Sequence, residues 1–549
     1  VYYPRRENEL TFKGNFWVND TTWAIKKINL EMAEDANVNW VKQIYIEKEF
    51  DVLNDSVFLI KKDFFMADLA LNKDEESGGF YGKRTVIYDD YIFNEVLPQE
   101  FYDQEVYRFN KEVYNRNEAF WAENRLEELN ENEIAVYQML DTLKSVKAFR
   151  NLFNLTTILA TGYVEMDGWD FGPVFSSIGY NEVEGLRLRV GGRTYFTQND
   201  TWRIEGYTAY GFKDDQFKYG ILGKVLLEPK YRVIASLGRR RDIEQLGASL
   251  TNSVDILGRS YASSALLNAG DNDKLSSIEV TTGSIEIEPW NNFTFRVNGS
   301  LRDIKPASEG FSFNYFTDES LTQTASTINQ TEFSTIFTYT PRRKTSGFGV
   351  EQNRVGKDFP TFFLSYSLGI KDLLESDFDY ERLQFFYDQP LMIGGFGRAH
   401  ARLEAGKIFG QVPLALLGVI PGNQSYFQNK NSFNLLNYYE FVTDTYVTFH
   451  FEHNFNGRLF SRIPGIRELN LREIVGIRAA WGQISNENKA IDASGLALTA
   501  PSEEPYWEYS FGISNIFKIL RFDAHFRGNY FDNPEARSFA ITGSFDIHF

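Results

Sequence analysis

The stretch that decides the fold is the last one, SFAITGSFDIHF, residues 538–549. Its apolar residues fall on one side of an extended chain, and they are Phe539, Ile541, Gly543, Phe545, Ile547 and Phe549. The residues between them are small or polar, and a period of two indicates a β-strand with one apolar and one polar face. In a soluble protein this strand would leave an aromatic edge open to pairing with other chains. A closed membrane barrel removes the edge and turns the apolar face toward lipid.

The composition agrees with a barrel wall. Of the 549 residues, 16% are aromatic and 24% are charged, and the mean hydropathy is -0.36. A wall with a lipid-facing outside and a polar inside explains this mixture. No apolar stretch reaches the ~18 residues that a membrane helix needs, so strands must make the crossing. The net charge of -18 disfavours nucleic acid as a partner, and the absence of cysteine excludes disulfides and thiol chemistry.

The same alternation recurs through the C-terminal part of the chain. In LRFDAHFRG, residues 520–528, Phe522 and Phe526 alternate with Asp523 and His525. From residue 171 onward we count about sixteen such segments, each near the ~9 to 11 residues of a tilted membrane strand. The predicted fold class is therefore all-β, with a transmembrane antiparallel β-barrel of about 16 strands over residues 164–549.

Two zones precede the predicted barrel. Residues 1–96 alternate in short runs broken by Asn-Asp and Asp-rich turns, which predicts a small periplasmic β-sheet domain. Residues 97–163 change character, because Asn130 followed by Glu133 resembles a capping box. Apolar residues then recur at near-helical spacing, namely Ile134, Tyr137, Leu140, Val146, Phe149 and Phe153. We expect this zone to be a helical linker that packs against its neighbours. We expect this sequence to be part of a longer precursor, so that Val1 is not the native N-terminus.

An even number of strands places both ends of the barrel on one side of the membrane. With the N-terminal zones in the periplasm, the connections at about 410–442, 485–504 and 529–537 are expected to be extracellular. The turns SNIFK and QPLMIGGFG are then periplasmic. The 410–442 connection is the longest in the C-terminal half, and a loop of this length is usually functional.

The sequence offers no catalytic site. In FHFEHNF, His450 and Glu452 share one face of a strand while His453 points to the other, so the three cannot converge on a metal ion. We find no nucleophile elbow, phosphate-binding loop, zinc-protease motif or dinucleotide fingerprint. We therefore expect no enzymatic activity, no metal and no cofactor.

Several runs resemble a family. YNEVEGLRLRVGGRT (180–194), GYTAYGFKDDQFKYG (206–220), LEAGKIFGQVP (403–413) and IPGIRELNLREIVG (463–476) are similar to a large uncharacterised Bacteroidota outer-membrane family. Its members carry an N-terminal carboxypeptidase-like regulatory domain, which we do not find within these 549 residues. VYYPRRENELTFKGNFWVND at the start also resembles that family's periplasmic sheet. The resemblance extends over essentially the whole chain and implies an outer-membrane barrel.

The barrel half is also distantly similar to the BamA and two-partner-secretion superfamily of sixteen-stranded barrels. There the sixth extracellular loop enters the lumen, and its Arg-Gly-aromatic tip packs on a Phe-x-Asp-x-Gly strand motif. The corresponding loop here has no such tip, and its candidate lumen residues are Gly422, Asn423, Gln424, Ser425, Tyr426 and Phe427. The wall position reads Arg478, Ala479, Ala480, Trp481 and Gly482, so only the glycine matches. This departure disfavours an independent insertase, and we expect the loop still to fold inward.

Three functions remain open. The first is an accessory barrel in outer-membrane protein assembly or secretion, with outer-membrane lipid, lipopolysaccharide and a BamA-type machine with its lipoproteins as partners. The second is a porin or transporter with a loop-plugged lumen, and the third is a structural or adhesive surface protein. The alternating tail also resembles the signal by which barrels reach their assembly machine, with Phe545, Ile547 and Phe549 as its apolar residues.

Overall fold

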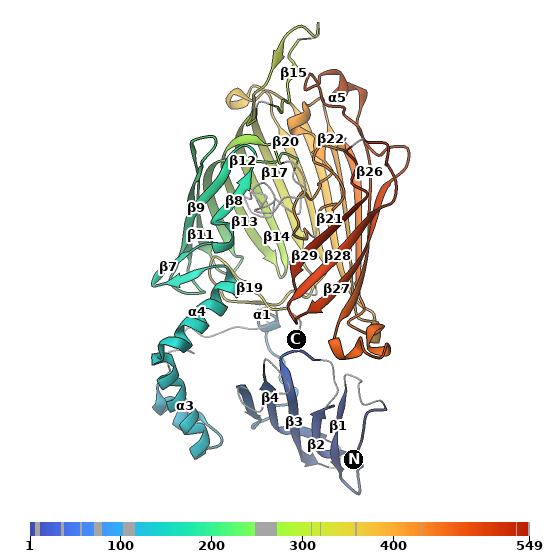
Figure 1. Cartoon of the computed structure of the whole chain (residues 1–549). Helices are drawn as coiled ribbons and strands as arrows, with labels where there is room; N and C mark the ends of the chain where they lie inside the picture. Colours follow the sequence, from blue (N-terminus) through green and yellow to red (C-terminus); the bar gives the residue numbers. More distant parts are fainter. Residues whose placement is uncertain are drawn as a thin grey trace.

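The computed structural model of the chain shows a barrel, an N-terminal sheet and a helical connection between them (Figure 1). It describes residues 1–549 apart from residues 6–10, 34–37, 55–56, 71–79, 103–115, 248–271, 309, 319, 357–358, 430, 534 and 547–549.

Among the described residues, the N-terminal sheet has five antiparallel strands that pair in chain order. They are β1 (Phe12–Val18), β2 (Ile25–Met32), β3 (Val41–Asn54), β4 (Val57–Leu69) and β5 (Phe80–Ile87). Its small core is formed by Met32, Ala33 and Val41, with Phe12 packed against them. The sheet therefore has little apolar interior and carries much of its apolar surface in the open.

In the described part of the connection between this sheet and the barrel there are four helices. They are α1 (Gln99–Tyr102), α2 (Glu118–Asn124), α3 (Glu131–Ser145) and α4 (Lys147–Thr161). The predicted capping box is confirmed, because the Asn130 side chain accepts from the Glu133 N–H while the Glu133 carboxylate accepts from the Asn130 N–H. The expected packing is wrong, since the predicted contact residues are exposed to 36–59%. Apolar spacing predicts a helix, but it does not tell whether protein covers the apolar face.

The barrel follows from residue 164. Its strands are β6 (Val164–Met166), β7 (Gly168–Phe171), β8 (Ile178–Asn181), β9 (Gly185–Tyr195), β10 (Trp202–Gly211), β11 (Gln216–Glu228), β12 (Val233–Glu244), β13 (Ser276–Trp290), β14 (Phe293–Pro306), β17 (Ile328–Tyr339), β20 (Thr361–Gly369), β21 (Tyr380–Met392), β22 (Arg398–Phe409), β25 (Thr445–Asn454), β26 (Arg472–Gln483), β27 (Tyr506–Ile516), β28 (Leu520–Arg527) and β29 (Phe539–Phe545). Short pairs lie in its connections: β15 (Tyr315–Phe316) with β16 (Thr324–Ala325), β18 (Thr345–Ser346) with β19 (Asn353–Arg354), and β23 (Gly418–Val419) with β24 (Val442–Thr443).

The wall has sixteen strands in the part of the chain that the structure describes. β7 and β8 follow one another along β9 and make one strand of the wall, and the three-residue β6 forms a hairpin with β7. The paired wall strands from β9 to β29 are antiparallel, and the strand order, which runs from β29 through β6 to β7, is that of a closed barrel. The predicted fold class is confirmed.

Side chains alternate across the wall as the sequence predicts. In β28, Phe522 is 46% exposed on the outside, whereas Asp523 and His525 are 1% and 0% exposed on the inside. In β29, Phe539, Ile541 and Phe545 all face outward and are 49–74% exposed. The polar inner face therefore surrounds a lumen, and the apolar outer face is the surface that suits lipid.

The connections divide between the two ends of the barrel (Figure 1). The long ones, including α5 (Asn486–Ala490), lie at the end far from the N-terminal sheet. The turn after β27 and the end of β29 lie near that sheet. Among the described residues, no helix is long and apolar enough to span a membrane.

The sheet touches the barrel through a reciprocal amide pair. Asn39 Nδ2 donates to Asn515 Oδ1 at 2.5 Å, and Asn515 Nδ2 donates to Asn39 Oδ1 at 3.2 Å and to Asn470 O at 2.6 Å. Both asparagines are 2% exposed, and the Lys518 ammonium lies 5.2 Å from the Trp40 ring centroid. These contacts fix the sheet below the barrel on the side of β26 and β27.

Candidate functional site

The lumen loop, residues 410–444 between β22 and β25, is buried inside the barrel. Most of its apolar side chains have exposures of 0–6%, namely Val412, Leu414, Leu416, Leu417, Val419, Ile420, Phe433, Leu435, Leu436, Phe441 and Val442. Tyr426 and Phe427 differ, because they are 53% and 46% exposed. Part of the loop packs against inward side chains of the wall, including Ile278, Ile304, Ile328 and Ile408. Loops normally lie on the surface, so an apolar loop sealed in a polar lumen is the main candidate feature of this molecule.

The residues that the sequence singled out form a tight turn in this loop. The Asn423 side chain accepts from Ser425 N at 3.0 Å and donates to Phe427 O at 2.8 Å. Gly422 forms a parallel bridge with Phe433, and a Cβ on Gly422 would lie 2.4 Å from Leu436 O. The turn therefore depends on a glycine, because no side chain would fit where its two limbs meet.

Glu508 of β27 anchors the loop to the wall. This carboxylate is 1% exposed and accepts from the loop N–H groups of Asn434 at 2.8 Å and Leu435 at 3.1 Å. It also accepts from Arg478 Nη1 at 3.2 Å and from Tyr506 Oη at 3.0 Å. Four donors satisfy one buried carboxylate, which is the condition under which a buried charge is stable.

His525 of β28 extends this anchor. Its Nδ1 lies 3.3 Å from Asn434 Nδ2 and 3.4 Å from Arg478 Nη1. Both neighbours are donors, so Nδ1 accepts and the ring proton is on Nε2, which lies 2.8 Å from Thr542 Oγ1. The histidine is a neutral bridge between the loop, β26 and β29.

Two further arginines hold the loop from β28 and from the connection that precedes β29. Arg527 ion-pairs with Glu440, and both side chains are nearly inaccessible, at 0% and 3%. Arg527 Nη1 also donates to Leu435 O at 3.2 Å. Arg537 Nη2 donates to Asn423 O at 2.9 Å and Leu436 O at 3.1 Å. Charged wall groups therefore bind both the side chains and the backbone of the loop.

Arg478, Ala480 and Gly482 of β26 are the residues at the position predicted for the superfamily's strand motif. They lie beside the lumen loop, although not through the Arg-Gly-aromatic contact of that superfamily. Arg478 supports Glu508, as described above. Ala480 is 1% exposed and belongs to a cluster with Ile420 and Phe433. A Cβ on Gly482 would lie 2.5 Å from Thr443 Cγ2, so glycine at this position lets the loop lie against the wall.

The lumen loop also reaches the last strand. Gly543 N donates to Tyr426 O at 2.8 Å, and Gln428 N donates to Gly543 O at 3.0 Å, which makes Phe427 and Gly543 a parallel bridge. Gly543 thus pairs with the loop on the edge opposite β28. Of the predicted tail signal, Phe545 is 74% exposed, whereas Ile547 and Phe549 lie outside the described residues.

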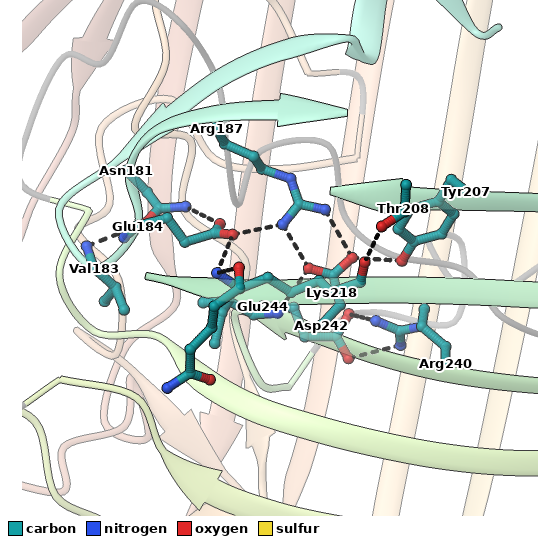
Figure 2. Close-up of polar contacts among 12 residues, drawn as sticks. Asn181, Val183, Glu184, Arg187, Tyr207, Thr208, Lys218, Arg240, Asp242 and Glu244 are labelled. Carbon is teal, nitrogen blue, oxygen red and sulfur yellow. Dashed lines mark hydrogen bonds and ion pairs between the residues drawn. The ribbon is translucent and has the colours of Figure 1, made fainter. Parts of the chain in front are cut away.

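A second buried polar cluster lies on β9, β11, β12 and the turn before β9 (Figure 2). Arg187 bonds Glu184 at 2.6 Å and both oxygens of Asp242 at 2.8 and 2.9 Å. Lys218 Nζ lies 3.0 Å from Glu184 and 2.5 Å from Asp214. Each of these charged groups has an oppositely charged partner within hydrogen-bond distance, so this cluster fixes the strand ends.

Beside the loop, a polar cavity of about 270 Å³ remains in the lumen. Its charged lining includes Arg240, Glu244, Arg296, Arg302, Glu332, Arg382, Glu404 and Lys407. Several of these are ion-paired, as Arg240 is with Glu244 at 3.0 Å and Arg302 with Glu332 at 3.1 Å. The described residues contain no group of three His, Asp or Glu side chains placed to hold a metal.

Sequence reasoning found the loop and the wall position but missed their partners. Glu508, His525, Arg527 and Glu440 lie up to 92 residues from the groups they bind, and no local motif connects them. The available signal was weaker: Glu508, Asp523, His525 and Arg527 all occupy inward positions of the last strands, where alternation had already placed polar side chains.

The comparisons with known proteins agree with this organisation. Residues 160–513 match the C-terminal domain of a family of unknown function, DUF5686, and residues 2–83 match DUF5686 itself. The chain belongs to this family. The DUF5686 match takes in the N-terminal sheet together with most of the barrel. None of the curated proteins matches the sequence.

Solved barrels are similar to this DUF5686 chain at low identity. BamA from Haemophilus ducreyi, lacking POTRA domains 1-3, is 12% identical with a TM-score of 0.42, over 70% of this chain and 71% of that one. CdiB from Acinetobacter baumannii is 11% identical with a TM-score of 0.34, over 67% and 57%. OccK10 from Pseudomonas aeruginosa is 11% identical with a TM-score of 0.29, over 66% and 91%. The chain thus spans little more than half of CdiB, and at these identities the similarity concerns the fold alone.

Proposed function

We propose that this outer-membrane-type barrel is an accessory component of protein assembly or secretion, with its N-terminal sheet in the periplasm of a Bacteroidota bacterium. Its proposed partners are outer-membrane lipid, lipopolysaccharide and a BamA-type assembly machine with its lipoproteins. The role involves no catalysis. The resemblance in runs such as YNEVEGLRLRVGGRT supports the taxon and associates the chain with a carboxypeptidase-like regulatory domain.

The observation that carries the proposal is the loop that occupies the lumen. A large barrel conducts unless something plugs it, and here a loop with a core of fully buried apolar side chains occupies the lumen. Glu508, Arg527 and Arg537 hold that loop by ion pairs and backbone hydrogen bonds. A plug held this firmly favours a role outside passive diffusion, in which the barrel acts through its surfaces.

Backbone pairing at β29 supports a protein-handling role. Gly543 uses its N–H and C=O to bind the segment Tyr426–Gln428, so the end of the wall is already paired with an extended piece of loop. Addition of extended segments to a sheet edge is a common mode of peptide recognition. The contact between Gly543 and the lumen loop supports the proposal, because it shows that the edge of β29 binds an extended segment.

The N-terminal sheet provides a second surface of this kind. β5 forms one side of the sheet, and its Phe80 and Tyr81 are 64% and 60% exposed. On β1, Phe16 and Trp17 are 44% and 48% exposed. Exposed aromatics grouped on strand edges are typical of protein interaction sites.

Native co-purification tests the proposal. The tagged full chain is expressed at its native level, outer membranes are extracted in mild detergent, and the proteins recovered in stoichiometric amounts are identified. The proposal predicts a BamA-type barrel or a secretion component in the eluate. Recovery of the chain alone, with unchanged amounts of other outer-membrane proteins after its deletion, would overturn it.

The alternative is a transporter with a loop-plugged lumen. The polar cavity beside the loop favours this reading, because it is lined by both arginines and carboxylates. A transporter would conduct or bind a small solute when the loop is released. Solute uptake by cells with and without the protein separates this candidate from the first.

A further inference from the structure

Helix α4 presents an apolar face that no described part of the protein covers. The face is formed by Ala148, Phe149, Leu152, Phe153, Leu155 and Leu159, which share one side at 100° per residue. Leu152, Leu155 and Leu159 are 60%, 53% and 62% exposed. Thr157 and Ile158, on the other side, are partly buried. The described rest of the protein therefore covers the helix only near Thr157 and Ile158, and its apolar face is exposed.

The end of α4 is fixed to the outside of the barrel wall. The helix ends at Gly162, whose φ is 78° and whose N–H donates to Ile158 O at 2.8 Å. The Gly162 carbonyl accepts from Val174 N at 2.7 Å, and a Cβ on Gly162 would lie 3.7 Å from Phe175. Phe175 is 66% exposed. The last turn of α4 thus lies beside an exposed aromatic residue in the short connection between β7 and β8.

The register gives the height of this attachment. Gly172 N donates to Gly191 O, whereas β9 continues to Tyr195, opposite Gly168. The helix end is therefore about four residues, or roughly 13 Å of strand, above the turn that follows β9. The end of α4 lies within the span of the wall, not below it.

An aromatic rim marks the membrane boundary at this end. Trp169, Phe196, Trp202 and Trp290 belong to its turns or strand ends and are 38–69% exposed, and the Phe196 and Trp202 rings lie 5.9 Å apart. Such girdles lie at the level of the lipid headgroups. Because α4 ends above the rim and descends below the barrel (Figure 1), it crosses the headgroup level.

The charges of α4 fit the same position. Lys147 and Arg150 lie in its first turn, and the helix contains no acidic residue. Lys and Arg at the far end of an apolar face are suited to lipid phosphates. Figure 1 shows α3 and α4 standing apart from the N-terminal sheet, so that sheet does not cover the apolar face.

We propose that α4 is a membrane-interface helix, with Leu152, Leu155 and Leu159 inserted among the acyl chains of the leaflet nearest the N-terminal sheet and Lys147 and Arg150 at the phosphates. Helix α4 would thereby add to the lipid-facing surface of the barrel. It would also fix the distance between the N-terminal sheet and the membrane. This inference does not depend on the proposed role in assembly.

Spin labels test the position directly, because the chain contains no cysteine. Leu152→Cys and Leu159→Cys report the apolar face, and Asn151→Cys and Asn154→Cys are the matched controls on the polar face. Each full-length variant is folded into vesicles of phosphatidylethanolamine and phosphatidylglycerol, and power saturation compares relaxation by oxygen and by a water-soluble nickel chelate.

The proposal predicts that oxygen relaxes the labels at Leu152 and Leu159 more than nickel does, with the reverse at Asn151 and Asn154. Equal access of nickel to all four labels would overturn it, because the helix would then lie in water. Labels at Leu152 and Leu159 that are shielded from both reagents would also overturn it, because another protein surface would then cover this face.

Discussion

Arg527 on the barrel wall forms an ion pair with Glu440 of the lumen loop, and the two side chains are 0% and 3% exposed. Arg527 also donates to Leu435 O and Tyr530 O. A single guanidinium therefore ties together the wall, the lumen loop and the connection before β29. A buried ion pair whose hydrogen bonds are all satisfied favours one position of the loop. Its net contribution to the free energy of unfolding is smaller than this effect on specificity.

Replacing Glu440 with Gln is expected to destabilise the closed barrel. The change leaves the Arg527 charge buried without its partner, and loss of one member of a buried pair costs about 3–5 kcal/mol. The midpoint of heat-induced unfolding, followed by the gel shift between folded and unfolded barrel, should fall.

The matched control for Glu440→Gln is Asp303→Asn. Asp303 pairs with Lys305 at 2.7 Å, but the side chains are 35% and 53% exposed. Exposed pairs contribute about 0–1 kcal/mol, so the control should stay near the parent protein. Equal midpoints for Glu440→Gln and the control would contradict a role for the buried pair.

Gly482→Ala is expected to loosen the lumen loop by steric conflict. Its new Cβ would lie 2.5 Å from Thr443 Cγ2 and 3.1 Å from Thr445 O, and overpacking of this kind costs about 1–3 kcal/mol. Protease cleavage within residues 410–444 should become faster. Gly223→Ala is the control, because the nearest atom to its Cβ would be 3.9 Å away; cleavage of both variants at the parent rate would refute this view of Gly482.

A disulfide tests the contact between the loop and the last strand. Phe427 and Gly543 are bridge partners, so oxidation of the double variant Phe427→Cys, Gly543→Cys should cross-link the chain and shift its mobility on a non-reducing gel. In the control, Phe427→Cys is combined with Phe522→Cys on β28, one strand further away. That pair exceeds the ~7 Å Cα limit for a disulfide; cross-linking of the control pair alone would contradict the register.

Asn39→Ala is expected to release the N-terminal sheet from the barrel. The change removes both hydrogen bonds with Asn515 and leaves a buried amide partly unsatisfied, which costs about 1–3 kcal/mol. Hydrogen exchange should accelerate in residues 38–41 and 514–519. Asn124→Ala, which removes an exposed amide on α2, should leave exchange in both segments unchanged.

The alternation of polar and apolar residues was sufficient to predict the barrel wall, because it shows within each strand which face is polar. Phe522 and His525 illustrate this, because one faces out and the other in, as expected. The capping box at Asn130 was equally local and equally visible. The apolar spacing of α3 and α4 was visible too, but whether protein or another surface covers it is a property of tertiary structure.

The contacts that hold the loop in the lumen were harder to predict from the sequence. A long loop between two strands predicts a functional segment, yet its partners Glu508 on β27 and His525 and Arg527 on β28 lie 73 to 92 residues away from it in the sequence. The bridge between Phe427 and Gly543 has no sequence signature, because backbone groups of any residue can make it.

The most direct test of the account is the conductance of the purified barrel in a planar lipid bilayer. Because the lumen loop is buried and held by Glu508, Arg527 and Arg537, we predict that the parent protein is silent and that deletion of residues 422–436 opens a stable conductance. A parent protein that conducts steadily, at the same level as the deletion variant, would contradict the conclusion that this loop closes the lumen.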